Sequence, residues 1–355
     1  MLNAPNGTES ETSSGCALFS FNVWSNCLRI LPGLFLTLLI AAIAFGLRVV
    51  PILAIISPIM LAMLIGIAYR FFARQPAWAV GGVLFSQRRL LRIAIVLLGL
   101  QLTVTQIIEL GAIALIILTT TLIFTFIFTV QVGRFLDVDP KLAQLIASGT
   151  AICGASAVFA ANEVVKGTEE DVTYAVACVT VFGTIAMLLY PLLPALLNLG
   201  PAEFGLWAGS SIHEIAQVVA ASFQNGQIAG EFATIAKLSR VTMLAPLVIA
   251  LDLLTRRAQN NGQASDKSAR RPFIPWFVVG FIVAVSVSSI VTIPVELKSH
   301  LMLLTTLFLA MALAAMGLQT DLANLRRKGF RPALLGALAF AFIGSFSLVC
   351  IKLLG

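Results

Sequence analysis

The stretch that decides the fold is Gly209-Ser210-Ser211-Ile212-His213-Glu214-Ile215-Ala216-Gln217-Val218-Val219-Ala220. It places an imidazole, a carboxylate and a carboxamide within five positions, between apolar runs at 204–208 and 215–223. The chain is 59% hydrophobic and only 11% charged, a composition typical of membrane-spanning helices. An ionisable side chain inside such a helix is costly and usually faces a cavity or a partner, so His213 and Glu214 are candidates for a functional site.

The same stretch predicts a break followed by a fresh helix start. Gly209 interrupts the helix, Ser211 is suited to the N-cap, and Glu214 follows at the spacing of a capping box. A helix that begins at membrane depth directs free backbone N–H groups at whatever precedes it, which favours an anion. A plainer interpretation has Ser211 and Glu214 cap a helix at the membrane surface, with His213 facing lipid headgroups.

Several other kinds of chemistry are disfavoured. A zinc protease motif needs a second histidine four positions after His213, but Gln217 stands there, and His300 is the only other histidine. The five cysteines include no C-x-x-C pair, so we expect no disulfide framework, metal site or other cofactor. The net charge of +7 comes from basic residues in loops between spans, which the topology rule explains without a nucleic-acid partner.

Length and hydropathy predict an all-α polytopic membrane protein with about 9–11 transmembrane helices. The mean hydropathy over 355 residues is +0.98. We expect residues 1–30 to be an N-terminal tail and surface segment, and 31–355 to be a single transmembrane transporter domain with a cytoplasmic linker at 256–272. The expected spans are 31–47, 51–72, 90–110, 112–133, 141–165, 172–198, 204–224, 232–255, 273–295, 300–320 and 332–354.

The basic loops set the predicted orientation. Lysine and arginine are concentrated in the loops at 70–89, 256–271 and 326–331, whereas the loops around Glu109, Gly226 and Glu296 are poor in them. Because cytoplasmic loops carry the excess of lysine and arginine, we expect a cytoplasmic N-terminus and an external C-terminus.

Two pairs of similar stretches suggest inverted repeats. Gly99-Leu100-Gln101 and Gly317-Leu318-Gln319 each end an apolar run, in spans that run in opposite directions. Gly149-Thr150-Ala151-Ile152-Cys153 likewise resembles Gly209-Ser210-Ser211-Ile212-His213. Paired interrupted segments are typical of a transporter binding site near the membrane midplane.

The interrupted segments 141–165 and 204–224 leave two topologies open. Each can cross the membrane as a broken helix, or enter and return on the same side, and both choices keep the basic loops inside. The small and hydroxyl residues at 148–156 also have two interpretations, as tight helix packing or as a loop that coordinates a small polar solute.

Lys237 and Arg240 lie deep within the predicted span 232–255. Their i,i+3 spacing places them on one helix face, and Pro246 is expected to break the same helix further along. They can extend towards an interface, or face the interior, where they balance Glu214 or attract an anion. Cys153 with His213 is a weaker candidate for a thiol–imidazole pair.

Three runs together resemble a known family. Thr150-Ala-Ile-Cys-Gly-Ala-Ser-Ala157, His213-Glu-Ile-Ala-Gln-Val-Val-Ala-Ala221 and Lys237-Leu-Ser-Arg-Val-Thr-Met-Leu-Ala-Pro246 resemble the YeiH-type bacterial inner-membrane proteins, as do the two Gly-Leu-Gln span ends. The resemblance covers the chain from about residue 30 onwards. That family is catalogued as sulfate exporters within the bile acid/arsenite/riboflavin transporter superfamily. The resemblance implies a secondary carrier with inverted repeats, broken helices and a core domain that moves against a scaffold domain.

The resulting hypothesis is a secondary transporter, not an enzyme, that moves a small anion such as sulfate or an organosulfonate across the bacterial inner membrane. His213 and Glu214 are the candidates for proton coupling, since a histidine titrates near neutral pH. The alternatives are a cation/proton antiporter that uses Glu214, a membrane-embedded thiol enzyme, and a channel or scaffold without a coupled site. The expected partners are the anion and the lipid bilayer, and a homo-oligomer is left open. The candidate substrate-binding residues are Gly149, Thr150, Cys153, Gly154, Ser156, Ser210, Ser211, Gln217, Lys237 and Arg240.

Overall fold

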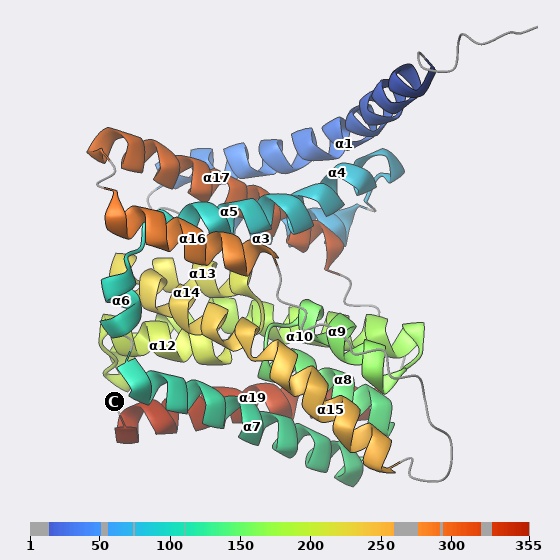
Figure 1. Ribbon diagram of the computed structural model, residues 1–355, viewed down its shortest axis with the longest axis vertical. Helices are drawn as coiled ribbons and strands as arrows, with labels where there is room; N and C mark the ends of the chain where they lie inside the picture. The colour runs from blue at the N-terminus through green and yellow to red at the C-terminus, as the bar shows by residue number, and fades with distance from the viewer. Residues whose placement is uncertain are drawn as a thin grey trace, which may run out of the picture.

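The chain is an all-α polytopic membrane protein, as predicted, and the part that the structure describes contains no strand (Figure 1). The computed structural model describes residues 14–50, 56–73, 75–109, 111–258, 276–291, 294–320 and 329–354. Most of the predicted linker at 256–272 therefore lies outside the described residues. Within them, six helices are long and apolar enough to cross a membrane. These are Ile30–Val49, Gly111–Phe135, Glu169–Leu192, Gln227–Asp252, Glu296–Gln319 and Phe330–Leu354.

The helices form two bundles that lie one above the other in Figure 1. A short helix, α6 (Val104–Glu109), connects them. The first bundle contains α1 (Ser14–Gly46), α3 (Pro58–Phe72), α4 (Val80–Phe85), η3 (Ser86–Leu90), α5 (Leu91–Gly99), α16 (Trp276–Ile290) and α17 (Val295–Gln319). The second contains α7 (Gly111–Phe135), α8 (Pro140–Ala151), α9 (Ala155–Val165), α10 (Glu169–Leu189), α12 (Pro201–Ser211), α13 (Ile215–Phe223), α14 (Gln227–Thr242), α15 (Leu244–Ala258) and α19 (Phe330–Leu354).

Local sequence signals explain several helix ends. The Asp139 carboxylate accepts the Lys141 N–H at 2.8 Å and so caps α8, while Thr168 and Asp171 form a reciprocal capping box at the start of α10. The helix predicted to break near Pro246 is interrupted at Met243, between α14 and α15. Proline lacks an N–H and clashes with the carbonyl four residues earlier, which accounts for a break one turn before it.

Segment 141–165 enters and returns on one side. Its two halves, α8 and α9, form an antiparallel hairpin, because the Lys141 ammonium at the start of α8 donates to the Lys166 carbonyl just after α9, at 2.9 Å. The two halves also pack closely near the tip, where a Cβ on Gly149 would come within 2.8 Å of the Val158 side chain. The structure therefore selects the re-entrant alternative for this segment.

Segment 204–224 is a second re-entrant hairpin, made of α12 and α13. Asn225, which follows α13, donates from its side-chain nitrogen to the carbonyl of Pro191, in the connection that leads to α12, at 3.3 Å. The next helix, α14, then runs parallel to α12, since Gly205 packs on Ala229 and Gly209 packs on Ala233. The chain thus turns back at the tip and re-enters from the same side.

The two hairpins enter from opposite sides, and α19 shows this directly. At its start, Arg331 lies 3.5 Å from Asp137, just before α8. At its far end, Lys352 lies 3.9 Å from Glu203, in the first turn of α12. The open ends of the two hairpins are therefore separated by the length of a membrane-spanning helix, and Figure 1 shows α9 and α12 at opposite ends of the second bundle.

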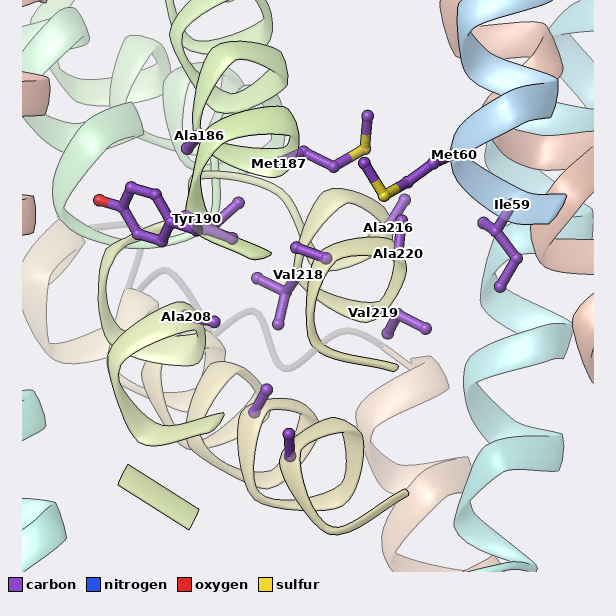
Figure 2. Close-up of a cluster of buried hydrophobic side chains, with 14 of the residues drawn as sticks. Ile59, Met60, Ala186, Met187, Tyr190, Ala208, Ala216, Val218, Val219 and Ala220 are labelled. Atoms are coloured by element: carbon purple, nitrogen blue, oxygen red, sulfur yellow. The ribbon is translucent and has the colours of Figure 1, made fainter. Parts of the chain in front are cut away.

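The two bundles meet through apolar side chains. Figure 2 shows Ile59 and Met60 of α3 facing Ala216, Val219 and Ala220 of α13. All five side chains are buried in one continuous hydrophobic cluster. A hydrogen bond also joins the bundles at one edge, from the Ser57 N–H to the Gln224 side-chain oxygen at 2.5 Å.

Both Gly-Leu-Gln motifs lie where two helices cross closely. A Cβ on Gly99 would come within 2.8 Å of the Phe281 carbonyl oxygen of α16, and one on Gly317 within 2.4 Å of the Met63 carbonyl oxygen of α3. Real Cβ atoms do not approach a backbone so closely, so both positions require glycine. The inverted repeat that these motifs suggested remains a prediction.

Candidate functional site

The tips of the two hairpins are short breaks of equal length. Residues 152–154 separate α8 from α9, and residues 212–214 separate α12 from α13. Gly154 has a φ of +69°, a conformation that side chains with a Cβ rarely adopt. Each tip therefore exposes one helix C-terminus and one helix N-terminus, whose backbone groups need partners at membrane depth.

The predicted helix start at Ser211 is wrong. Ser211 is the last residue of α12, and its hydroxyl donates back to the Trp207 carbonyl at 2.5 Å, as serine does within a helix. The restart comes three residues later, where Glu214 occupies the N-cap and its N–H donates to the Gln217 side-chain oxygen at 3.2 Å. The capping pair is thus Glu214 with Gln217, at the same spacing but shifted along the chain.

Lys237 joins the two tips. Its side chain is fully buried in α14, and its ammonium donates to the Ile152 carbonyl at 2.7 Å and to the Ile212 carbonyl at 2.6 Å. These carbonyls belong to the first residue after α8 and after α12. One cation therefore binds equivalent positions of both hairpins.

Arg240, one turn further along α14, repeats this arrangement. One guanidinium nitrogen donates to the Ser210 carbonyl at the end of α12, and the other donates to the Ala151 carbonyl at the end of α8. The side chain is fully buried. Cations at helix C-termini are favoured by the helix dipole, and here they also satisfy carbonyls that would otherwise lack donors.

Glu214 connects the second tip to the first. The backbone N–H of Ala155, the first residue of α9, donates to its carboxylate, and the Thr180 hydroxyl of α10 lies 3.4 Å from Oε1. A Cβ on Gly154 would come within 2.5 Å of the Glu214 Cγ, so the carboxylate side chain lies directly on this glycine. Among the residues that the structure describes, no ion pair joins Glu214 to Lys237 or Arg240.

Gln217 fixes the second hairpin against α10. Its amide nitrogen donates to the Thr180 carbonyl at 3.1 Å and to the Thr184 hydroxyl at 3.3 Å. A Cβ on Gly183 would lie 2.0 Å from the Gln217 side-chain oxygen, so Gly183 makes the room for this carboxamide. Thr180, Gly183 and Thr184 of α10 are neighbours of the candidate site that the sequence interpretation missed. The signal available was their i, i+3, i+4 spacing of small and hydroxyl side chains in an apolar span.

The remaining candidates lie around the tips in different surroundings. The hydroxyls of Ser210 and Ser211 both donate to the Trp207 carbonyl and are buried. The thiol of Cys153 lies 3.2 Å from the hydroxyl of Ser156, which is exposed. Gly149 and Thr150 are buried in the last turn of α8, where Thr150 offers its carbonyl to Arg240 at 3.3 Å.

No hydrogen bond joins His213 to Cys153 in the described part of the chain. The His213 ring is 1% exposed and lies 6.2 Å from the Phe340 ring of α19, and its Nδ1 has no hydrogen-bond partner in the described structure. The hydrogen-bond partner of Cys153 is Ser156 instead. The geometry therefore does not assemble the thiol–imidazole pair considered from the sequence. The substrate and coupling roles of all these residues remain predictions.

A cavity of 240 Å³ between the two bundles reaches this site. It is lined by Phe159 of α9 and Thr180 of α10 on one side, and by Gln87 of η3 and Gln319 of α17 on the other. Because the Thr180 hydroxyl contacts the Glu214 carboxylate, the cavity ends one hydrogen bond away from Glu214. The described lining contains hydroxyls and carboxamides but no charged side chain.

Comparisons with known proteins place the chain among bacterial membrane proteins. A family model described as Conserved hypothetical protein 698 matches residues 32–336. The chain is 38% identical over 320 residues to the UPF0324 inner membrane protein YeiH of Escherichia coli K12, covering 88% of this chain and 91% of that protein. It is 39% identical over 327 residues to a UPF0324 membrane protein of Pseudomonas aeruginosa, covering 89% and 92% respectively. It is 35% identical over 323 residues to one of Bacillus anthracis, covering 91% and 92%. No solved structure matches the chain at a significant level.

Proposed function

Because the chain belongs to the UPF0324 family of membrane proteins, we propose that it is a secondary transporter that carries a small anion across the bacterial inner membrane. The observation that supports this most is the meeting of two re-entrant hairpins, which enter from opposite sides, at two buried cations. Interrupted helices paired in this way are typical of carrier binding sites near the midplane. The resemblance to sulfate exporters makes sulfate, a related sulfur oxyanion or an organosulfonate the candidate substrate.

The proposed binding site lies at the tips, where α9 and α13 begin. Helix N-termini favour negative charge, and Lys237 and Arg240 add two positive charges beneath the tips. Of the predicted hydroxyls, that of Ser156 is on an exposed residue, so we assign it the first contact with the anion. Ser210 and Ser211 would have to release the Trp207 carbonyl before they could donate to a substrate.

Glu214 is the proposed proton-coupling residue. Its carboxylate occupies the N-terminus of α9, and a substrate anion that used the same N–H groups would compete with it. Protonation of Glu214 would remove this competition, which couples proton uptake to anion binding. His213 is the second coupling candidate, through its unpartnered Nδ1. We place the N-terminal end of α1 in the cytoplasm and the C-terminus outside, following the basic loops.

A cation/proton antiporter is the alternative that one observation favours. The donors of Lys237 and the terminal nitrogens of Arg240 are directed at backbone carbonyls, which leaves Glu214, one hydrogen bond from Thr180 in the wall of the 240 Å³ cavity, as the charged group at the tips that can bind an ion there. A carboxylate in that position could bind a cation instead of excluding an anion. The two functions differ in the ion that drives exchange.

Counterflow in proteoliposomes tests the proposal. Vesicles that contain the purified protein are loaded with unlabelled sulfate, sulfite or propane-1-sulfonate and diluted into the labelled anion. A carrier gives saturable uptake that internal unlabelled anion accelerates. Uptake driven only by sodium or a pH gradient, with no anion counterflow, would support the antiporter, and flux without saturation or counterflow would indicate a channel. Loss of a chemical activity in Cys153→Ala, without any counterflow in the parent protein, would support the thiol enzyme.

A further inference from the structure

A second cavity, of 390 Å³, opens between the bundles on the side where α1 ends. The first bundle contributes the end of α1 with the short helix η1 (Leu47–Val49) that follows it, the end of α5, the start of α3 and the first half of α17, and the second contributes α13 and the start of α14. Its volume lies within the range of small-molecule sites, about 300–1,000 Å³. We call it the Arg48 cavity, after its one charged side chain among the described lining residues.

The polar lining of the Arg48 cavity matches an anion. Within the described lining there is one guanidinium and no carboxylate, and Arg48 itself is exposed and forms no ion pair with any residue that the structure describes. The start of α3 also lies in the wall, so a positive helix end adds to the field of the guanidinium. Neutral hydrogen-bonding groups complete the polar part, from Ser57, Gln101, Gln224, Gln227, Thr305 and Thr306.

The position of Arg48 is not explained by membrane orientation. The loops rich in lysine and arginine lie on the opposite side of the membrane from Arg48. The rule that cytoplasmic loops carry these residues therefore does not account for an arginine at position 48. Lys352, on the same side, is engaged by Glu203 at 3.9 Å and by the Asn198 carbonyl at 2.7 Å. Arg48 has no such partner among the residues that the structure describes, so its charge is available to a ligand.

The rest of the wall is apolar and indicates the kind of anion. Phe45, Ile59, Leu98, Val219 and Phe223 line the cavity, and Figure 2 shows Ile59 and Val219 on facing helices of the two bundles. A bare, strongly hydrated anion gains nothing from such a surface, whereas a ligand with a carbon body buries apolar area against it. The other cavity, of 240 Å³, has no charged residue in its described lining and so lacks this combination.

From this geometry we infer that the Arg48 cavity is a second binding site, for a small organic anion that has a sulfonate or carboxylate head group on an apolar body. The guanidinium of Arg48 binds the head group, and the apolar wall contacts the body. The inference rests on the proposed anion transport, in which this cavity would receive the substrate on the side opposite the basic loops. It also narrows the substrate class from inorganic sulfate towards organic anions.

The test measures binding of propane-1-sulfonate and of inorganic sulfate to the full chain in lipid nanodiscs, by calorimetry. We expect wild-type protein to bind propane-1-sulfonate more tightly than sulfate, and Arg48→Gln to weaken propane-1-sulfonate binding about tenfold or more, the effect of losing a charged hydrogen bond. Arg48→Lys, which keeps the charge but not the forked geometry, should lie between the two. Lys298→Gln is the matched control, because Lys298 is an exposed cation of α17 that does not line the cavity.

The outcomes separate this inference from the proposed function. Anion counterflow by the wild type with an unchanged Kd for propane-1-sulfonate in Arg48→Gln would overturn the inference and leave the transport proposal standing. An equal loss in Lys298→Gln would show a general effect of surface charge and would also overturn it. Equal affinity for sulfate and propane-1-sulfonate would show that the apolar wall does not contact the carbon body of the ligand, and would overturn the inference of an organic anion. Because Arg48 is exposed, Arg48→Gln should fold, and thermal unfolding checks this directly.

Discussion

Ile152 and Ile212 direct their carbonyl oxygens at the same ammonium group, that of Lys237, at 2.7 and 2.6 Å. Each is the first residue after a half-helix, so a single side chain satisfies equivalent groups of both hairpins. Neither hairpin tip can shift relative to the other without breaking one of these bonds. The two tips therefore behave as one structural unit within the second bundle.

Lys237→Met should destabilise the protein substantially. The substitution keeps most of the side-chain volume but leaves two buried carbonyls without their donor, at a cost of about 1–3 kcal/mol each. Lys141→Met is the matched control, because the Lys141 ammonium also donates to a carbonyl, that of Lys166, but on an exposed side chain. Thermal unfolding in detergent should show a large loss for Lys237→Met and almost none for Lys141→Met. Similar midpoints for both variants would contradict the assigned role.

Gly154→Ala should disturb Glu214 as well as the backbone. A methyl group at this position would lie 2.5 Å from the Glu214 Cγ, so the carboxylate would be displaced from the Ala155 N–H. Gly226→Ala is the control that separates backbone strain from displacement of Glu214. Gly226 also has a positive φ, of +108°, but a Cβ there would meet no other atom within 4 Å. We expect both variants to lose about 1–3 kcal/mol from backbone strain, and only Gly154→Ala to change the pH dependence of anion uptake. An identical pH profile in both would place Glu214 outside the coupling step.

Glu214→Gln should make anion transport independent of pH while anion binding persists. The substitution keeps the shape and an acceptor for the Ala155 N–H but removes the titrating group. Uptake measured with and without a pH gradient should become equal in this variant. Glu203→Gln, at the start of α12, is the control and should retain the response. Retained pH-driven transport in Glu214→Gln would exclude Glu214 from coupling.

Gly183 and Gln217 should be energetically coupled. A Cβ on Gly183 would collide with the Gln217 carboxamide at 2.0 Å, so Gly183→Ala should destabilise the wild type by more than 1 kcal/mol. In a Gln217→Ala background the space is free, and the same substitution should cost much less. A double-mutant cycle on thermal stability measures this difference. Additive effects would show that α10 and α13 do not contact each other through this pair.

Apolar patterning predicted the fold class and the two interrupted segments, because length and composition alone determine whether a helix can cross the bilayer. It could not decide whether the segments cross or return. That depends on contacts between distant residues, such as Asn225 with the Pro191 carbonyl. The local spacing of Ser211 and Glu214 fitted a capping box, but Ser211 stays in α12 because its hydroxyl bonds to the preceding turn.

The candidate site was predicted by residue type but not by partner. Buried charges in an apolar chain indicated Lys237, Arg240, His213 and Glu214, and the structure places all four at the hairpin tips, with His213 lying against the Phe340 ring. It directs the cations at backbone carbonyls instead of at Glu214. A linear sequence shows that a charge must be satisfied at that depth, but not which backbone atoms are within its reach.

The contact between the bundles has a mechanical consequence. The facing side chains in Figure 2 are alanines, a valine, an isoleucine and a methionine, whose attraction depends on separation and hardly on direction. Such a surface resists pulling apart far more than it resists sliding. Resistance to sliding then comes from directional bonds at the margin, such as that of Ser57 with Gln224. A sliding movement of the first bundle over the second is therefore opposed mainly by hydrogen bonds at the margin of their interface, and little by the apolar contact itself.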